Sequence, residues 1–530
     1  MTEDWDLVVI GLGAAGVCAA IEAAEAGLKV AALDRFEGGG ATAISGGVVY
    51  AGGGTSVQVE AGVEDTPEAM FDYLKLETQG VVSDETLKRF CQASPQMIEW
   101  LRARGVPFEA SLCPTKTSYP SNDYYLYYSG NEAFAPYSEH ATPAPRGHRA
   151  IGKGLPGANF FAPLNAAARR AGVTFFHHTC AERLVTEGGG VVGVSGRQLT
   201  KGLHAYLHAQ LERWAIRCNP YAPRWARRLR RWGAAWHRRF AQRLTLHAGS
   251  VLVTTGGFIY NRDRVKREAP SYRRGMPLGT IGCDGSGIAL AEAVGAQTRH
   301  MERISAWRFI NPPRGFARGV LVDGSGRRFV NEALYGAALG EAIVERAHGR
   351  AYLILNERLV QQSKSQLGRG QTHWFQTAPA LLNLWFGSTR HATAQGLADR
   401  LGLDAAQLRQ TLEDYSADAE DALGKPDAFR ASLASGPYVA IDCSIDSRWF
   451  PLPTLTLGGL VVDEATGRVL GDNDEPIVGL YAAGRAALGI CSRQYVSGLS
   501  IADCVFSGRR AAAAVTTARE RDASGREGSR

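Results

Sequence analysis

The chain has 530 residues, of which 45% are apolar and 62 are glycine, so it can bury a large core and is long for one domain. No run of 18 consecutive apolar residues occurs, which argues against a bilayer-spanning helix. The nine cysteines show neither CxxC nor metal-ligand spacing, and no signal-peptide pattern precedes the first predicted strand. We therefore expect reduced thiols, no metal site and a cytoplasmic location.

The net charge of +7 is concentrated in one segment. Residues 197–247 carry twelve arginines and lysines and a single acid, Glu212, which gives this segment +11 and leaves −4 for the rest of the chain. The basic character therefore belongs to an insert and needs its own explanation.

The first predicted elements form a nucleotide-binding pattern. The apolar strand Asp6–Ile10 is followed by a glycine-rich turn over 11–16, an alanine-rich helix over 17–26 and a second strand that ends at Asp34. A helix N-terminus attracts phosphate groups, and an acid at the end of the second strand can accept hydrogen bonds from a ribose. The segment therefore predicts dinucleotide binding.

Each glycine of the turn has a separate physical task. Gly11 permits the tight turn, Gly13 lets the backbone approach a pyrophosphate, and Gly16 lets helix and strand pack closely. Further glycine-rich segments follow at 37–47, 251–257, 282–287 and 479–484. Contacts so far apart in sequence fit an elongated cofactor, which favours FAD over NAD.

These motifs resemble those of the FAD-binding flavoproteins of fumarate reductase and succinate dehydrogenase, and more narrowly the 3-ketosteroid dehydrogenases within that family. The resemblance covers roughly residues 5–195 and 248–515 and rests on GxGxxG, Thr255-Gly-Gly257, the turn at 284–287 and Gly479-Leu-Tyr-Ala-Ala-Gly484. It implies an α/β fold, with a Rossmann-like FAD-binding domain in three parts (1–199, 248–290 and 441–515) and an inserted α+β catalytic domain (291–440). We expect residues 516–530, which are polar, to be a disordered tail.

The motifs and the resemblance together predict non-covalent FAD. The predicted FAD contacts are Gly11, Gly13, Ala14, Ala15, Gly16, Asp34, Arg35, Gly40, Ala41, Thr42, Ser45, Gly46, Gly47, Thr255, Gly256, Asp284, Gly484, Arg485, Gly498, Leu499 and Ser500. Arg485 stands where dicarboxylate-handling relatives often have a flavin-contacting glutamate, which puts that one contact in doubt.

The substrate motif departs from that of the dicarboxylate enzymes. Those relatives use a histidine ahead of a Thr-x-Gly-Gly turn and an arginine near the C-terminus. Here the stretch 453–459 has no histidine, and Tyr495-Val-Ser497-Gly498 replaces the arginine segment. Arginine is the natural partner of a carboxylate, so its absence argues against fumarate or succinate and favours a neutral carbonyl compound.

The segments 123–132, 145–148, 328–335 and 479–510 resemble the Δ4-(5α) group of 3-ketosteroid dehydrogenases. The Δ1 group has a glycine four places after the tyrosine, where this chain has Leu499, so 4,5-desaturation is favoured over 1,2-desaturation. The resemblance implies that Tyr335 and Tyr495 flank the A ring and that Ser497 joins removal of a C4 proton while hydride leaves C5 for flavin N5. Spacing does not assign separate roles to the two tyrosines. A free serine is a poor base near pH 7, so Ser497 would need a proton relay.

Other interpretations of these residues stay open. Gly498, Tyr125 and Tyr128 are expected to contact the substrate, although the tyrosines of 124–128 could be packing residues and Tyr335 could be a core tyrosine. The fold could also serve a Δ1-dehydrogenase or an enone reductase. No second GxGxxG followed by an acid occurs, so we expect an electron carrier such as a quinone rather than NAD(P)H.

The basic insert, residues 200–247, predicts a helical hairpin. Leu203, Leu207, Leu211 and Trp214 recur at helical spacing, residues 219–223 break the helix, and a second stripe follows at Trp225, Leu229, Trp232, Trp236, Phe240 and Leu244. Arginines surround the stripe, a pattern typical of a helix lying on a membrane surface. We expect peripheral attachment to the inner face of the cell membrane. The alternatives are a subunit or electron-acceptor interface, a solvated face, or a flavin-binding module whose insert binds nucleic acid; no nucleic acid is expected for the enzyme.

Overall fold

The computed structural model describes residues 4–200, 202–219, 222–368, 371–417 and 420–527. Its main sheet joins strands that are far apart in the sequence, in the order β19–β20–β9–β1–β2–β6, with β8 and then β7 branching from β9. β1 is parallel to both β2 and β9, and Val8 lies opposite Ala31 on one side and Val251 on the other. The strands are β1 (Trp5–Ile10), β2 (Val30–Leu33), β6 (Thr174–Phe176), β7 (Thr179–Glu187), β8 (Gly190–Gln198), β9 (Gln242–Val253), β19 (Arg468–Leu470) and β20 (Pro476–Ala482).

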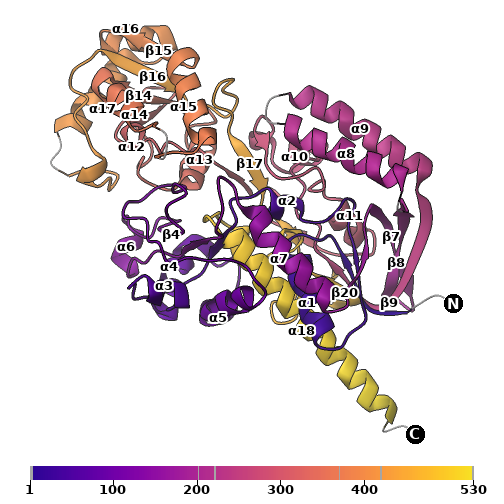
Figure 1. The fold of residues 1–530 in the computed structure, drawn as a ribbon. Helices are drawn as coiled ribbons and strands as arrows, with labels where there is room; N and C mark the ends of the chain where they lie inside the picture. The colour runs from indigo at the N-terminus through magenta and orange to yellow at the C-terminus, as the bar shows by residue number, and fades with distance from the viewer. Residues whose placement is uncertain (1–3, 201, 220–221, 369–370, 418–419, 528–530) are drawn as a thin grey trace.

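The apolar runs of β1, β2 and the end of β9 are buried because helices cover the parallel part of the sheet. α1 (Ala14–Glu25) packs against α7 (Gly157–Arg170) and along α18 (Leu499–Glu527). Figure 1 shows α18 in yellow crossing beneath the sheet and extending beyond it to the C-terminus. The nucleotide-binding unit predicted from the sequence is confirmed.

The expectation of a disordered tail from residue 516 is wrong for most of that segment. α18 continues to Glu527; residues 528–530 lie outside the described part of the chain. The helix is already nucleated by its packing on α1, and adding residues to an existing helix costs little when they are good helix formers such as alanine, arginine and glutamate. Arg519 also forms an ion pair with Asp6 at the start of β1.

A helical layer and a small antiparallel sheet, β3–β5–β4, complete the N-terminal part of the FAD-binding domain. This sheet brings the aromatic segment around residue 127 beside the C-terminal motif. The elements are α2 (Gly40–Ala43), β3 (Val48–Tyr50), α3 (Ser56–Glu60), α4 (Pro67–Thr78), α5 (Asp84–Ala103), β4 (Leu126–Tyr127), α6 (Tyr137–His140) and β5 (Gly147–Arg149).

The catalytic lobe is built on a four-stranded antiparallel sheet, β13–β14–β16–β15, with its own apolar core. In Figure 1 it stands apart from the FAD-binding domain at the upper left. Its elements are α12 (Arg314–Ala317), β13 (Val320–Asp323), α13 (Gly336–Glu345), β14 (Ala351–Asn356), α14 (Glu357–Ser365), α15 (Trp374–Phe386), β15 (Ser388–His391), α16 (Ala394–Leu401), α17 (Ala405–Ala417) and β16 (Tyr438–Asp442).

The limits of this lobe differ from the expected 291–440. β16 runs past residue 440, while β11 (Thr298–Arg299) and β12 (Ile304–Ala306) pair with β18 (Gly459–Leu460) and β17 (Pro453–Thr456). Strand pairing therefore places residues 298–306 in the connecting sheets between the two parts. β10 (Met276–Pro277) pairs with β17 in the same sheet as β12. Two helices precede the lobe in the chain, α10 (Arg262–Glu268) and α11 (Ser286–Glu292), and α11 contacts β7 and β18.

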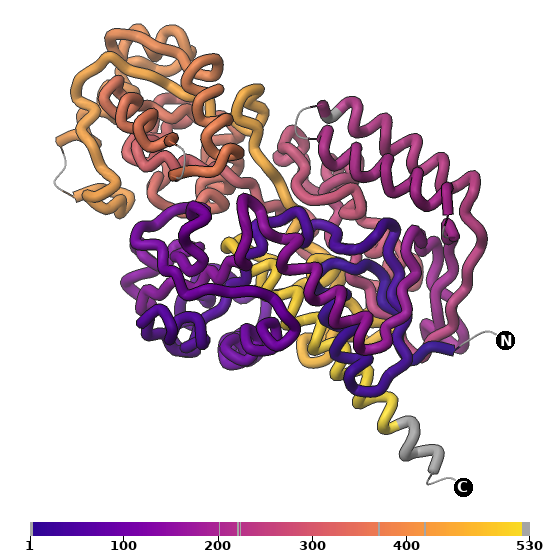
Figure 2. Tube along the Cα trace, in the orientation of Figure 1, coloured from indigo at the N-terminus to yellow at the C-terminus, as the bar shows by residue number. Residues whose placement is uncertain are grey.

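The basic insert is a pair of helices, α8 (Leu203–Cys218) and α9 (Pro223–Phe240), which pack against each other and lie side by side in Figures 1 and 2. Residues 220–221 of the predicted break lie outside the described residues. The hairpin ends earlier than expected, because β9 starts at Gln242 and Leu244 pairs with Gly196 of β8. Leu244 is therefore a strand residue and not part of the helical stripe.

Candidate active site

One cavity of about 570 Å³ links the FAD-binding domain to the catalytic lobe. At one end it is lined by the turn after β1 and by Asp34; at the other it is lined by aromatic residues of the lobe and by the segment 495–500. Asp34, Arg35 and Arg485 are its charged lining residues among those described. The described lining residues that the lobe contributes are therefore uncharged, which suits a neutral, apolar ligand.

The nucleotide end of the cavity has the form that a dinucleotide requires. A Cβ on Gly16 would lie 2.0 Å from the Gly11 carbonyl oxygen, so turn and helix touch there, whereas a Cβ on Gly13 would meet nothing closer than Thr42 Oγ1 at 3.6 Å. The space above Gly13 is thus left open for a ligand at the N-terminus of α1. Asp34 is fixed by the Leu12 and Phe36 N–H groups, which donate to Oδ2 and Oδ1 at 2.9 and 2.8 Å. These residues fit FAD.

Most predicted FAD contacts line this cavity. The lining includes Gly11, Gly13, Ala14, Ala15, Asp34, Arg35, Gly40, Ala41, Thr42, Ser45, Gly46, Thr255, Gly256, Gly484, Arg485, Gly498 and Ser500.

Four predicted contacts do not line the cavity. Gly16 touches Gly11, Gly47 packs against Pro156, and Leu499 is a fully buried core residue. Asp284 acts through another side chain, because Arg35 Nη1 donates to it at 2.6 Å and thereby holds Arg35 at the cavity wall. All four adjoin residues of the site without lining the cavity, and their direct contact with FAD stays a prediction.

Tyr335, Tyr495 and Ser497 come together at the lobe end of the cavity. Tyr335 precedes α13, and its ring centroid lies 5.7 Å from that of Phe309. Tyr495 packs on Trp307 with centroids 4.5 Å apart. Burial raises the pKa of both tyrosines, so both hydroxyls remain protonated donors.

Ser497 has a partner that sequence reasoning missed. Its Oγ lies 3.2 Å from the Tyr127 hydroxyl, and Ser129 Oγ donates to its carbonyl at 3.1 Å. Tyr127 is fully buried, and burial raises its pKa. Tyr127 lies in β4, which pairs antiparallel with β5. The sequence held no signal for its contact with Ser497, because alternation along a strand places Tyr125 and Tyr127 on the same face.

The other two tyrosines singled out in this segment lie elsewhere. Tyr125 is buried under the Arg149 guanidinium, 5.0 Å from its ring centroid, and does not line the cavity. Tyr128 also lies off the lining, and its carbonyl accepts a hydrogen bond from Lys116. Tyr119 lines the cavity, whereas Tyr127, like Tyr125 and Tyr128, does not and is connected to the site through Ser497.

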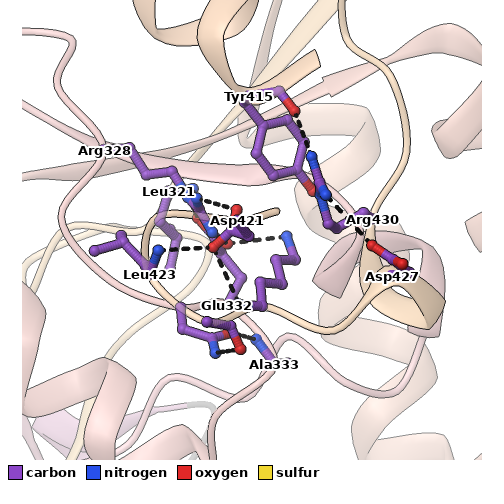
Figure 3. Close-up of polar contacts among 12 residues, drawn as sticks. Leu321, Arg328, Glu332, Ala333, Tyr415, Asp421, Leu423, Asp427 and Arg430 are labelled. Atoms are coloured by element: carbon purple, nitrogen blue, oxygen red, sulfur yellow. Dashed lines mark hydrogen bonds and ion pairs between the residues drawn. The ribbon is translucent and has the colours of Figure 1, made fainter. Parts of the chain in front are cut away.

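The backbone before Tyr335 is held by a buried ionic network in the lobe (Figure 3). Glu332 pairs with Arg328 at 2.8 Å and Lys425 at 2.9 Å, and it accepts the Leu321 N–H. Burial opposes ionisation of Glu332, but the two cations outweigh it and keep its pKa below the usual range. The Tyr335 N–H itself donates to Asn131 Oδ1 at 2.7 Å, which ties the tyrosine to the FAD-binding domain.

Among the described residues, no arginine of the catalytic lobe lines the cavity. Arg493, the nearest in sequence, donates to Glu341 at 3.0 Å and does not line the cavity. No group of three or more histidine, cysteine or acidic residues with metal-binding geometry occurs in the part of the chain that is described. The fold and this cavity define a flavin-dependent oxidoreductase acting on an uncharged substrate.

Comparison with known proteins agrees with this class. Residues 6–498 match the family described as "FAD binding domain". The chain is 38% identical over 492 residues to a 3-oxo-5-alpha-steroid 4-dehydrogenase of Comamonas testosteroni, covering 90% of this chain and 92% of the relative. A 3-oxosteroid 1-dehydrogenase of Mycolicibacterium smegmatis is 26% identical and is covered to 94%.

Among solved structures, the 3-ketosteroid-Δ4-(5α)-dehydrogenase of Rhodococcus jostii RHA1, in complex with 4-androstene-3,17-dione, aligns with a TM-score of 0.80 at 31% identity, covering 97% of both chains. The chain belongs to the FAD-binding family and, within it, to the 3-ketosteroid dehydrogenases of Δ4-(5α) type. FAD is its cofactor.

Proposed function

We propose that the protein is a 3-oxo-5α-steroid 4-dehydrogenase that introduces the C4–C5 double bond of a 3-ketosteroid. The observation that carries the proposal is the convergence of two protonated tyrosines and Ser497 at the lobe end of the FAD cavity. The names of the Comamonas and Rhodococcus relatives support the same regiochemistry.

The tyrosines bind and polarise the ketone. Hydroxyl donors aimed at the C3 oxygen stabilise the enolate that forms when a C4 proton leaves, and burial strengthens this interaction. Tyr335 and Tyr495 are the candidate donors, and their raised pKa values keep them from ionising. Because the lining that the lobe contributes is uncharged, it does not favour a carboxylate substrate.

Ser497 takes the place of the proton acceptor at C4. Its hydrogen-bond partner, the Tyr127 hydroxyl at 3.2 Å, makes the first step of a proton relay. Because burial keeps this tyrosine protonated, it must release its own proton for each one that it takes, and the relay ends in solvent water. When bound, FAD supplies the acceptor for the hydride that leaves C5. The remaining lining, including Trp307 and Phe309, excludes water from the reacting atoms.

Anaerobic mixing with a saturated 5α-3-ketosteroid tests this assignment. The flavin absorbance should bleach and an enone should accumulate, because the tyrosines and Ser497 would act on C4 and C5. Adding a quinone should then restore the flavin colour whereas NAD⁺ should not, since the carrier is proposed to be a quinone. Bleaching by a 4-en-3-one but not by the saturated ketone would instead assign Δ1 chemistry, and bleaching by neither would remove the steroid assignment.

We also propose that the hairpin attaches the protein to an anionic membrane surface. Five of its large apolar side chains are well exposed: Leu203, Tyr206, Trp214, Trp225 and Trp232 are 54–68% accessible. Leu207, Leu211, Leu229 and Trp236 are half-buried. On the buried sides lie small or polar residues, including Ala209, Glu212 and Ala226. Tryptophan with surrounding arginine fits the headgroup boundary, and each basic residue near an anionic leaflet adds about 1 kcal/mol. No described helix is long and apolar enough to cross a bilayer.

Replacing Trp225 and Trp232 together by serine should reduce co-sedimentation with phosphatidylserine-containing liposomes at least tenfold. The two indoles are exposed and would lose their place at the headgroup boundary. Trp385→Ser is the matched control, because Trp385 is 62% exposed but lies on α15 of the catalytic lobe. Equal binding by the double variant and the unchanged protein, or preference for RNA over liposomes, would contradict membrane attachment.

A further inference from the structure

The buried side of α8 contacts the loop that carries Asp34. The His208 ring stacks on Phe36, with centroids 5.6 Å apart and planes at 14°. Phe36 lines the FAD cavity, and its N–H donates to Asp34 Oδ1 at 2.8 Å. One stacked pair thus connects the hairpin to the acid at the nucleotide end of the cavity.

A second connection runs through His178, which follows β6. The His178 N–H donates to the Phe36 carbonyl at 3.0 Å, and its Nδ1 lies 3.1 Å from His208 Nδ1. From α9, His237 Nε2 contacts the His178 carbonyl oxygen at 3.0 Å. Burial, with further contributions from His178 and His237, lowers the pKa of His208 to about 3, so its ring is neutral and can share one hydrogen between the two Nδ1 atoms.

Two further contacts, nearer the surface, also join the hairpin to the FAD-binding domain. Arg213 Nη2 donates to Glu37 Oε2 at 2.7 Å, and Asn219 Nδ2 donates to the Tyr260 hydroxyl at 3.3 Å. Tyr260 in turn donates to the carbonyl of Gly279, another cavity-lining residue. Both side chains of the Arg213–Glu37 pair are half-exposed, so this ion pair contributes little to docking of the hairpin. The buried contacts of His178, His208 and His237 contribute more.

We propose that the hairpin of α8 and α9 is a retention element for FAD: it holds the loop 34–37 in its binding geometry and thereby raises the affinity for the cofactor. A loop that is already ordered loses less conformational entropy when the ligand binds. His208 is then a positioning residue that acts through Phe36 and Asp34. This role goes beyond membrane attachment and holds whether or not the outer face of the hairpin touches lipid.

Two histidines on the same helix test the proposal. In the full-length protein, His208→Ala should weaken FAD binding by about tenfold, since one stacked pair and one buried hydrogen bond are lost. His204→Ala is the control, because His204 lies one turn earlier, is exposed, and stacks on Phe240 of α9 with centroids 4.2 Å apart instead of on Phe36. The measurement is a titration of each apoprotein with FAD, followed by quenching of flavin fluorescence without lipid or steroid. Unchanged affinity in His208→Ala, or an equal loss in both variants, would overturn the proposal.

The unmodified protein offers a second test that needs no variant. If a docked hairpin raises FAD affinity, FAD must stabilise docking by the same factor. Amide hydrogen exchange of residues 205–215 should therefore slow when FAD is added to the apoprotein, more than exchange of α16 in the catalytic lobe. Equal slowing of the two helices, or no slowing of α8, would refute the coupling even if the protein still oxidises steroids.

Discussion

Ser497→Ala should lower kcat for a saturated 5α-3-ketosteroid at least a hundredfold. General acid–base groups typically contribute factors of 10² to 10⁴, and Ser497 is the residue placed to accept the C4 proton. The flavin content and the steroid dissociation constant should change little, because the side chain is small and the tyrosine donors remain. Steady-state kinetics together with steroid binding to the oxidised enzyme measure the two effects separately.

Two further variants test whether the loss of kcat is specific to Ser497 and its hydrogen-bond partner. Tyr127→Phe removes the hydroxyl 3.2 Å from Ser497 and should lower kcat in the same direction while the ring keeps its packing. Ser492→Ala serves as the control, because Ser492 is also buried nearby, bonds the Gly489 N–H and does not line the cavity. A Ser497→Ala enzyme with normal kcat would show that another group removes the proton.

Gly16→Ala should prevent normal FAD loading and destabilise the apoprotein. The added Cβ would lie 2.0 Å from the Gly11 carbonyl oxygen, and neither backbone can move without shifting α1 away from β1. Forcing atoms into a packed site costs about 1–3 kcal/mol, and here the displaced atoms form the FAD turn itself. The flavin-to-protein absorbance ratio and the thermal unfolding of the apoprotein check both effects.

Gly13→Ala should weaken FAD binding without changing the stability of the apoprotein. Its Cβ would meet no protein atom closer than 3.6 Å, so the apoprotein should unfold at the unchanged temperature while FAD affinity falls at least tenfold. Gly249→Ala, on β9 with ordinary contacts at 3.5 Å, should alter neither quantity. If Gly13→Ala bound FAD normally, the open space above this residue would not be the cofactor's place.

The parts that sequence reasoning located well are those encoded within a few consecutive residues. Gly11, Gly13 and Gly16 act through the backbone of one turn, and Tyr495 and Ser497 belong to one short motif. The choice between a carboxylate and a neutral ketone also followed from the residue types at 495–498. In each case the chemistry depends on neighbours along the chain, which spacing displays directly.

The prediction made for the hairpin from the sequence was only partly right. Helical periodicity predicted both helices. Of the predicted stripe, Leu203, Trp214, Trp225, Trp232 and Phe240 are exposed, whereas Leu207, Leu211, Leu229 and Trp236 are half-buried. Periodicity gave no sign that His208 would stack on Phe36, 172 positions earlier in the sequence, because a histidine on the polar side of a helix looks like any solvated residue. Leu244 was misplaced for a related reason, since pairing with β8 overrode the helical spacing.

The sequence by itself therefore determined the cofactor class, the two tyrosines with Ser497 as candidate catalytic groups, and the amphipathic insert. Only the tertiary structure decided that Tyr127 rather than Tyr125 or Tyr128 meets Ser497, that Asp284 acts through Arg35, and that the last helix continues to Glu527. The physical reason is that turns, caps and helix faces depend on local spacing. A contact between residues 127 and 497 depends instead on how separate strands pair and pack, which no local pattern records.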